Sequence, residues 1–285
     1  MKKVLFLLMI PVLCFGQNVN IPDANFKAYL VGNLDINTNG DGEIQLSEAS
    51  VFDSLMNLSK LNISDLTGIE AFTALTSLVC SENKLTNLDV SKNTALRVLG
   101  CRNNQINTLD VSKNTALRVL ACRDNQLSTL DLTKNTALTY LDCSQTQLST
   151  LDLTKNIALR ELYCGRNQLT TLDLTKNIAL TYLYCSENKL TNLDVSQNTA
   201  LTKLYCGRNQ LTSLDVSKNT ALTRLGCSDN QLTSLDVSKN TALTYLYCYH
   251  NKLTNLDVSK KTALTYLNCG GNKFDCDSLK AKYGL

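Results

Sequence analysis

The sequence is poor in the residues on which most enzyme sites depend. It contains a single histidine, His250. It also has no glycine-rich phosphate-binding loop, and no pair of carboxylates outside a repeated pattern that could share acid and base roles. These shortages argue against a hydrolase or another enzyme, so we expect no catalytic activity. They also disfavour a mixed cysteine and histidine metal array, because only one imidazole is available.

The chain lacks an excess of charge of one sign. Lys and Arg number 28 against 25 Asp and Glu, a formal charge of +3, and removal of Lys2 and Lys3 with an amino-terminal segment would lower it to +1. Nothing in this balance indicates a nucleic-acid partner.

Long apolar runs are also missing, except at the amino terminus. The run from Val4 to Phe15 follows Met1-Lys2-Lys3 and is too short to span a bilayer. It is typical of a secretory signal peptide cleaved after Gly16. We therefore expect an exported protein, extracellular or at the cell surface, with no transmembrane segment in the mature chain. Lipid attachment at Cys14 is an alternative, which bulky Leu13 disfavours because lipoprotein signals carry a small residue there.

A 21-residue repeat fills most of the chain. From Leu75 to Asn272 it reads L-x-x-L-x-C-x-x-N-x-L-x-x-L-D-(V/L)-(S/T)-K-N-x-A with few exceptions, and an earlier unit at 56–73 has Leu58 at the cysteine position. A fixed period in this range indicates a solenoid, in which each unit buries its apolar edge against its neighbours. The repeat cysteines are Cys80, Cys101, Cys122, Cys143, Cys164, Cys185, Cys206, Cys227, Cys248 and Cys269.

These motifs resemble the leucine-rich repeat family in its short bacterial form, and the stretch ISDLTGI at 63–69 is similar to the internalin variety. The resemblance implies an α/β solenoid: a right-handed arc with a parallel sheet of about eleven rungs on one face, usually a surface that binds other molecules. We divide the chain into a signal peptide (1–16), a helical amino-terminal cap (17–57), the repeat domain (58–272) and a carboxy-terminal cap (273–285). The segment opposite each strand is too short for a helix, so the outer face should be extended or in single helical turns, and the arc gently curved.

The repeat cysteines are predicted to be buried free thiols. In L-x-C the two side chains are two residues apart on a strand and point to the same face, into the solenoid. Successive cysteines then stack about 4.8 Å apart with parallel Cα–Cβ bonds, whereas a disulfide prefers Cβ atoms about 3.8 Å apart. Disulfides and a metal array are the alternatives. Cys276 lies outside the register and is the candidate for a bridge to Cys269.

Asparagine also recurs in the repeat, at the turn after each strand, where a side-chain amide can satisfy buried backbone groups. In the resembled family these residues form a structural asparagine ladder, which Thr146 interrupts here. Its members are Asn83, Asn104, Asn125, Asn167, Asn188, Asn209, Asn230, Asn251 and Asn272.

A second recurring column is acidic. Stacked carboxylates repel, so each needs compensation from backbone amides or from the Lys three residues on. We interpret these residues as turn-stabilising, with a cation-binding stripe as the alternative. They are Asp89, Asp110, Asp131, Asp152, Asp173, Asp194, Asp215, Asp236 and Asp257.

Ahead of the repeats, residues 37–48 read NTNGDGEIQLSE and match most positions of the EF-hand calcium loop. The spacing predicts a weak, structural Ca²⁺ site with a dissociation constant of about 10⁻⁴ to 10⁻³ M, because an Asn stands at the first position in place of the usual Asp. The alternative is an Asn- and Gly-rich turn that binds no metal. The predicted ligands are Asn37, Asn39, Asp41, Glu43 (through its carbonyl), Gln45 and Glu48.

Helices should flank this loop. Asp23 is placed to cap a helix that carries Phe26, Tyr29 and Leu30 at helical spacing, and a second helix is expected from Leu46 to Leu55. Such a unit beside a solenoid end is better suited to capping than to sensing, because terminal repeats expose apolar edges. At the other end Phe274, Leu279 and Tyr283 should close the stack.

Tyrosine and arginine gather in the variable strand positions that face outward. Nine of the eleven Tyr and all eight Arg lie in this region, while Lys dominates the opposite turns. Tyr and Arg are enriched in recognition hot spots, which predicts a binding surface for a protein or a glycan. A structural spacer whose tyrosines only shield the sheet is the alternative, and His250 is expected to be a surface contact. The candidate ligand-binding residues are Tyr163, Tyr182, Tyr184, Tyr205, Tyr245, Tyr247, Arg160, Arg166 and Arg208.

Overall fold

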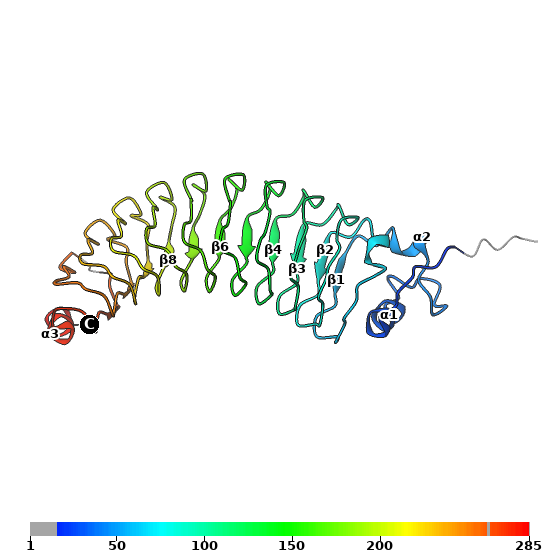
Figure 1. The fold of residues 1–285 in the computed structure, drawn as a ribbon, viewed down its shortest axis with the longest axis horizontal. Coiled ribbons are helices and arrows are strands. Elements are labelled where there is room, and N and C mark those ends of the chain that lie inside the picture. Colours follow the sequence, from blue (N-terminus) through cyan, green and yellow to red (C-terminus); the bar gives the residue numbers. More distant parts are fainter. Residues whose placement is uncertain (1–15, 261–262, 285) are drawn as a thin grey trace, which may run out of the picture.

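The computed structural model describes residues 16–260 and 263–284. Residues 1–15 of the expected signal peptide, with Cys14, lie outside the described residues. The described chain winds into a solenoid that stacks as a gently curved arc with a helical cap at each end (Figure 1). Among these residues no helix is long and apolar enough to cross a membrane.

One parallel sheet of eleven strands runs along the solenoid, and each strand pairs with the next one in the sequence. This confirms the predicted solenoid and its eleven rungs. The strands are β1 Leu55–Asn57, β2 Ser77–Val79, β3 Val98–Gly100, β4 Val119–Ala121, β5 Tyr140–Asp142, β6 Glu161–Tyr163, β7 Tyr182–Tyr184, β8 Lys203–Tyr205, β9 Arg224–Gly226, β10 Tyr245–Tyr247 and β11 Tyr266–Asn268.

The repeat length fixes the register of these strands. Leu99 of β3 pairs with Leu120 of β4, 21 residues on, and the same pairing joins the central leucines of later strands. Each central residue points into the solenoid, so the first and third residues of every strand face outward. The 21-residue period therefore lines up two outward-facing rows of side chains.

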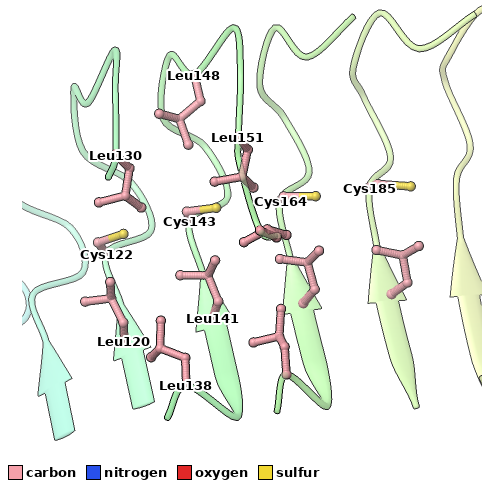
Figure 2. Close-up of a cluster of buried hydrophobic side chains, with 14 of the residues drawn as sticks. Leu120, Cys122, Leu130, Leu138, Leu141, Cys143, Leu148, Leu151, Cys164 and Cys185 are labelled. Carbon is pink, nitrogen blue, oxygen red and sulfur yellow. The ribbon is translucent and has the colours of Figure 1, made fainter. Parts of the chain in front are cut away.

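The cysteine ladder lies inside the arc. Nine repeat cysteines are free, and all of them have no exposed surface. Figure 2 shows Cys122, Cys143, Cys164 and Cys185 following one another through the core. Burial raises the pKa of the Cys164 thiol from 9.0 to about 12. The prediction of buried free thiols is confirmed for these nine residues.

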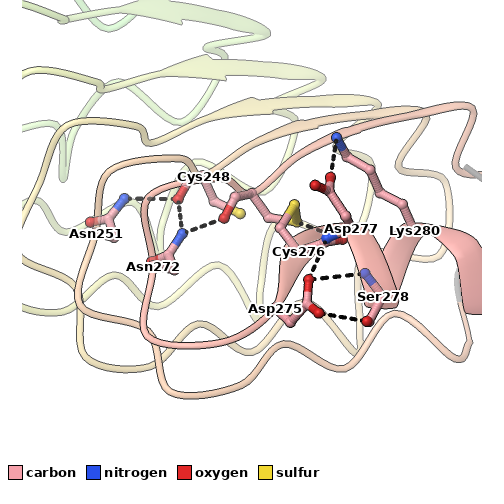
Figure 3. Close-up of a disulfide and its surroundings, with 9 residues drawn as sticks. Cys248, Asn251, Asn272, Asp275, Cys276, Asp277, Ser278 and Lys280 are labelled. Carbon is pink, nitrogen blue, oxygen red and sulfur yellow. Dashed lines mark hydrogen bonds and ion pairs between the residues drawn. A yellow bond between two sulfur atoms is a disulfide. The ribbon is translucent and has the colours of Figure 1, made fainter.

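The tenth repeat cysteine forms a disulfide. Cys269 bonds to Cys276, with Cα atoms 5.5 Å apart, as predicted. The bond ties the last repeat to α3 (Cys276–Tyr283). The amides of Asp277 and Ser278 in the first turn of α3 donate to the side chain of Asp275 (Figure 3). Phe274, Leu279 and Tyr283 pack against the core and close the stack, again as predicted.

The asparagine ladder joins successive turns. Asn104 Nδ2 donates to the carbonyls of Cys80 and Cys101 at 3.0 and 3.1 Å, and its Oδ1 accepts from the Leu85 amide at 3.0 Å. Each amide thus bridges two repeats, as the resemblance implied. At the interruption, Thr146 Oγ1 lies 3.0 Å from its own Cys143 carbonyl and 2.7 Å from Asn167 Oδ1. The hydroxyl replaces only part of the missing amide.

A second, fully buried asparagine ladder runs along the opposite side of the coil, and the sequence analysis overlooked it. Asn114 Nδ2 donates to the carbonyls of Val90 and Asn93 at 2.9 Å each. In all eight members the Oδ1 atom has no hydrogen-bond partner among the described residues. The members are Asn93, Asn114, Asn135, Asn156, Asn177, Asn198, Asn219 and Asn240.

The aspartate column stabilises turns. Asp89 Oδ1 accepts from the Ser91 amide at 2.9 Å, and this bond, more than the charge of Lys92, lowers the pKa of the carboxyl. The predicted compensation by backbone amides is therefore present. Opposite the sheet the described repeats are built from turns, as expected, and the 3-10 turn η1 (Ile69–Ala71) belongs to the first unit.

The amino-terminal cap contains two helices, α1 (Ala24–Val31) and α2 (Leu46–Ala49). Asp23 caps α1 through the amides of residues 25 and 26, as predicted. The predicted helix from Leu46 to Leu55 was wrong in length. It ends after one turn because Phe52 turns into the core and the chain must enter the sheet at Leu55, which pairs with Ser77.

Candidate ligand-binding face

Two rows of side chains form the outward face of the sheet, which we call the sheet face. The first row holds the first residue of each strand and the second row holds the third. In the second row Tyr163, Tyr184 and Tyr205 pair in direct succession across β6, β7 and β8. Their aromatic rings are half-buried, so each ring packs on the sheet while keeping part of its surface open.

Five tyrosines form a first cluster by packing diagonally between the rows. Ring centroids lie 5.4 Å apart for Tyr140 and Tyr163, 4.7 Å for Tyr163 and Tyr182, 5.8 Å for Tyr182 and Tyr205, and 6.3 Å for Tyr184 and Tyr205. Burial raises the pKa of Tyr163, and it raises that of Tyr182 to about 12. The hydroxyls of Tyr163 and Tyr182 therefore stay protonated to higher pH than usual. Tyr163, Tyr182, Tyr184 and Tyr205 are brought together as the sequence predicted.

Three further tyrosines form a second cluster. The Tyr266 ring lies 6.0 Å from that of Tyr245 and 5.0 Å from that of Tyr247. Strand β9 separates the clusters, because it places Gly226 between Tyr205 and Tyr247, and Arg224 between Lys203 and Tyr245. The predicted site residues Tyr245 and Tyr247 thus belong to a different cluster from the other four tyrosines.

Cations already lie over these rings. The Lys203 amine is 5.5 Å from the Tyr182 ring centroid, and the Arg224 guanidinium carbon is 4.8 Å from that of Tyr245. Both distances suit a cation–π contact. The tyrosine rings of this surface therefore already contact cationic side chains of the same chain.

Along one edge of the sheet face runs a row of alternating charge, which we call the charge row. Arg166 Nε lies 3.0 Å from Glu187, Arg208 lies 3.6 Å from Glu187 and 3.7 Å from Asp229, and His250 Nδ1 lies 2.9 Å from Asp229. All five residues adopt left-handed backbone conformations, with φ between 50° and 58°. Sequence reasoning found the two arginines as contact residues but missed the acids between them. The alternation of basic and acidic residues becomes visible when the residues at this position of successive repeats are compared.

Arg160 lies apart from the charge row. It precedes β6, and its backbone amide donates to the carbonyl of Thr139 at 2.9 Å. Its side chain is exposed. The structure thus places Arg160 at the end of the strands opposite to Arg166 and Arg208, and these three predicted residues do not form one group.

In the earlier rungs an arginine crosses the sheet face. Arg102 Nη2 donates to the Tyr140 hydroxyl at 2.8 Å and lies 3.2 Å from the carboxylate of Asp142, which is buried. Two small residues, Gly100 and Ala121, stand in the second row before Asp142 and leave room for the arginine. The sheet face is therefore covered by an arginine side chain in the early rungs and by tyrosine rings in the later ones.

A pocket of about 280 Å³ opens between the two tyrosine clusters. We call it the tyrosine pocket. Its walls are aromatic, its floor includes two glycines, and members of the charge row form part of its rim. The lining residues are Tyr184, Ser186, Glu187, Tyr205, Gly207, Arg208, Gly226, Ser228, Asp229, Tyr247 and Tyr249.

The predicted calcium loop is closed by its own hydrogen bonds. Asp41 Oδ2 accepts from Asn39 Nδ2 at 3.1 Å and from Gln45 Nε2 at 3.0 Å. Glu48 Oε1 accepts from the Thr38 amide at 2.8 Å, and its Oε2 accepts from the Gln45 amide at 3.0 Å. The side chains at the third, fifth and ninth loop positions thus converge.

Two other loop side chains have partners of their own. Asn37 Oδ1 accepts from the Gly40 amide at 3.1 Å and its Nδ2 donates to the Val31 carbonyl at 3.0 Å, and the Glu43 carboxylate is held 2.6 Å from Lys27 Nζ. Within residues 16–260 and 263–284, no three His, Cys, Asp or Glu side chains are grouped closely enough to hold a metal ion. Any cation at this loop would depend on amide and carbonyl oxygens beside two carboxylates.

Comparison with known proteins supports the repeat assignment. The family model for leucine-rich repeats (two copies) matches residues 178–219 and 220–261. The functional domain of InlJ from Listeria monocytogenes, whose structure includes a cysteine ladder, superposes with a TM-score of 0.84 at 41% identity, over 89% of this chain and 57% of that one. The fold is a leucine-rich repeat solenoid.

Two further comparisons show how far this similarity extends. Internalin J from Listeria monocytogenes serotype 4b is 43% identical over 78 residues, which are 26% of this chain and 8% of that protein. A leucine-rich repeat protein of Leptospira interrogans has a TM-score of 0.71 at 23% identity, over 76% of this chain and 60% of that one, a likeness of fold alone. The chain therefore spans only part of the length of the internalin proteins to which it is similar.

Proposed function

We propose that this protein is an exported, non-enzymatic binding protein that recognises a protein partner through the sheet face. The observation that carries the proposal is the pair of tyrosine clusters on one open surface. Tyrosine offers a large, rigid and amphipathic contact area, and it is enriched in interface hot spots. The similarity to leucine-rich repeat proteins of the internalin kind supports a protein-binding role.

The sheet face is poorly built for shielding alone. A spacer would gain most by covering every rung, yet β9 places Gly226 between Tyr205 and Tyr247 in the second row. The Tyr266 side chain also remains 42% exposed. These two features favour recognition over the spacer function.

Capture experiments with residues 17–285 test the proposal. The test variant changes Tyr163 and Tyr182 to Ala, which removes the closest ring pair of the first cluster while leaving the tyrosine pocket lining intact. A matched control changes Lys155 and Lys176 to Ala, because both are exposed in the turns opposite the sheet. Proteins captured by the parent and the control should be lost from the test variant, with thermal melts confirming that all three fold.

Retention of every captured protein by the Tyr163 and Tyr182 variant would exclude the first tyrosine cluster from the binding surface. A glycan array run in parallel addresses the second ligand class, since tyrosine also stacks on sugar rings. Glycans bound in place of proteins would contradict the proposed protein partner. Capture of neither class by the parent chain would favour the spacer function.

We also propose that the loop at 37–48 binds Ca²⁺ weakly as part of the amino-terminal cap. The convergence of Asn39, Asp41 and Gln45 around one carboxylate supports this proposal. Rotation of the two side-chain amides would present oxygen in place of nitrogen. Asp41 is already suited to a cation, because hydrogen bonding from the Glu43 amide lowers its pKa and keeps it ionised.

A further inference from the structure

The tyrosine pocket exists because the second row has a gap. Tyr184 and Tyr205 stand on one side of Gly226 and Tyr247 stands on the other. A Cβ atom at position 226 would lie only 2.8 Å from Cδ1 of the Tyr205 ring, so the missing side chain lets that ring occupy its present place. The result is a recess with aromatic walls.

Two carboxylates, Glu187 and Asp229, line the pocket with Arg208 between them. One oxygen of each is already paired, because Arg166 Nε donates to Glu187 Oε1 at 3.0 Å and His250 Nδ1 lies 2.9 Å from Asp229 Oδ1. Arg208 lies 3.6 and 3.7 Å from the two acids, beyond the roughly 2.7–2.9 Å of a charge-assisted hydrogen bond, and its side chain is 61% exposed. Glu187 Oε2 and Asp229 Oδ2 therefore keep accepting capacity toward a further cation.

One polar atom of the lining has no partner. Ser228 is 5% exposed, and its Oγ has no hydrogen-bond partner among the described residues. An unpaired buried hydroxyl costs free energy, so such groups ordinarily find a donor or acceptor. A donor reaching the pocket floor would supply one. This observation is independent of the charge at the rim.

The ligand chemistry follows from these features together. Aromatic walls, carboxylate oxygens with remaining accepting capacity and an unpaired hydroxyl suit a group that is flat, positively charged and rich in N–H donors. A guanidinium meets all three conditions, because it stacks on aromatic rings and donates to carboxylates in pairs. The chain already places Arg224 over Tyr245 on the same face.

Resting on the proposed protein-binding function, we propose that the tyrosine pocket receives an arginine side chain of the protein partner. The guanidinium lies between the tyrosine rings and donates to Glu187 and Asp229. Arg208 then acts as a resident competitor for the same carboxylates. The partner should accordingly present an exposed arginine at the centre of its contact surface.

Binding of small probes to residues 17–285 tests this site directly, with calorimetry or NMR titration as the measurement. The probes are N-acetyl-arginine amide, the uncharged isostere N-acetyl-citrulline amide, N-acetyl-lysine amide and methyl β-glucoside. The arginine amide should bind at least about tenfold more tightly than the citrulline amide, because only the first carries the charge. Equal binding of these two amides would overturn the proposal. Tighter binding of the lysine amide or the glucoside would do the same.

Variants then locate the site. Changing Glu187 to Gln and Asp229 to Asn should weaken arginine amide binding at least about tenfold. The backbone should be retained, because Gln145 and Asn103 adopt the same left-handed conformation at this repeat position. Asp124→Asn is the matched control, since Asp124 holds this position outside the pocket and should leave binding unchanged. If the double variant binds the arginine amide as well as the parent, the pocket is not the site.

Arg208→Gln gives a result that a merely structural role would not produce. Removal of the resident cation should strengthen arginine amide binding severalfold, and weaker binding would contradict its role as competitor. Failure of the pocket and failure of the proposed function are separable. If the probes do not bind but the Tyr163 and Tyr182 variant loses its captured protein, the arginine assignment falls and the sheet face stands. If the probes bind but the parent chain captures no protein, the proposed protein-binding function falls instead.

Discussion

Gly226 lies directly beside Tyr205 in the second row of the sheet face, and a Cβ atom at position 226 would come within 2.8 Å of the Tyr205 ring. The same repeat position in β3 is Gly100, where an added Cβ would meet Val79 at an ordinary 3.4 Å. Two glycines at one position of the repeat thus have different surroundings. Of these two positions, only 226 requires glycine, because the neighbouring Tyr205 ring leaves no room for a side chain.

Gly226→Ala should therefore lower the free energy of unfolding by about 1–3 kcal/mol, the usual cost of overpacking. Gly100→Ala should change it by less than about 0.5 kcal/mol, because the added methyl meets no close contact. Urea unfolding followed by circular dichroism measures both. Equal effects of the two substitutions would mean that the Tyr205 ring moves away without cost.

The strand register was predictable from the sequence, whereas the packing of the rings was not. A 21-residue period with Leu before Cys determines which side chains point inward, and Leu99 over Leu120 follows from it. The lean of each tyrosine depends on the size of its neighbours. The Tyr205 ring leans over Gly226 and the Tyr184 ring over Gly165, where an added Cβ would lie 2.1 Å from Cε1. Such choices depend on three-dimensional space that a repeat pattern does not encode.

The buried thiols should make stability fall at high pH. The pKa of Cys164 is raised from 9.0 to about 12, so in the folded chain it stays neutral where an unfolded chain would ionise. The stability that this neutral thiol contributes is complete below pH 9 and is lost as the pH rises toward 12. At pH 10 the loss is about 1 kcal/mol for one such thiol.

Cys164→Ala should accordingly be less stable than the parent at pH 7, by about 1 kcal/mol for the cavity, and the difference should nearly vanish at pH 10. Urea unfolding at the two pH values under anaerobic conditions measures this change. Leu162→Ala, on the strand before it, removes no titratable group and serves as the control. If the difference in unfolding free energy between the parent and Cys164→Ala stays constant with pH, ionisation of this buried thiol is not the cause of the loss of stability.

The carboxy-terminal disulfide should hold the cap in place. Cys269 and Cys276 are separated by seven residues, and closing a loop of this size stabilises the cap by about 2–3 kcal/mol. Cys276→Ser should therefore speed amide hydrogen exchange in α3 by at least about tenfold, while the central strands stay protected. Dithiothreitol should reproduce this effect in the parent chain and add nothing to the variant. Unchanged exchange in α3 would show that its apolar contacts suffice.

The charge row and the second asparagine ladder were both visible in principle. Arg166, Glu187, Arg208 and Asp229 are spaced 21 residues apart, but charged residues in a variable position look like solvated surface until the strands are stacked. The asparagine of K-N-x-A recurs in eight successive repeats, from Asn93 to Asn240, and its burial could have been suspected from that recurrence. Its bonding to the preceding repeat, as in Asn114 to Val90, depends on the path of the coil.

Calcium should stabilise the amino-terminal cap through Asp41. The carboxylate of Asp41 faces the amides of Asn39 and Gln45, which can turn their oxygens toward a cation. Titration of residues 17–285 with CaCl₂ should give a dissociation constant of about 10⁻⁴ to 10⁻³ M and a rise in melting temperature. Asp41→Asn removes one ligand charge and should weaken binding by at least about tenfold.

Asp65→Asn provides a matched control for this experiment. Asp65 is an exposed aspartate whose Oδ1 accepts from the Thr67 amide at 2.8 Å, just as Asp41 Oδ1 accepts from the Glu43 amide at 2.9 Å. The two substitutions therefore disturb the same kind of turn, and only the change at Asp41 lies in the loop. Calcium binding that falls equally in both variants would be a general electrostatic effect. Neither heat nor a melting shift in the parent chain would leave residues 37–48 as a hydrogen-bonded turn.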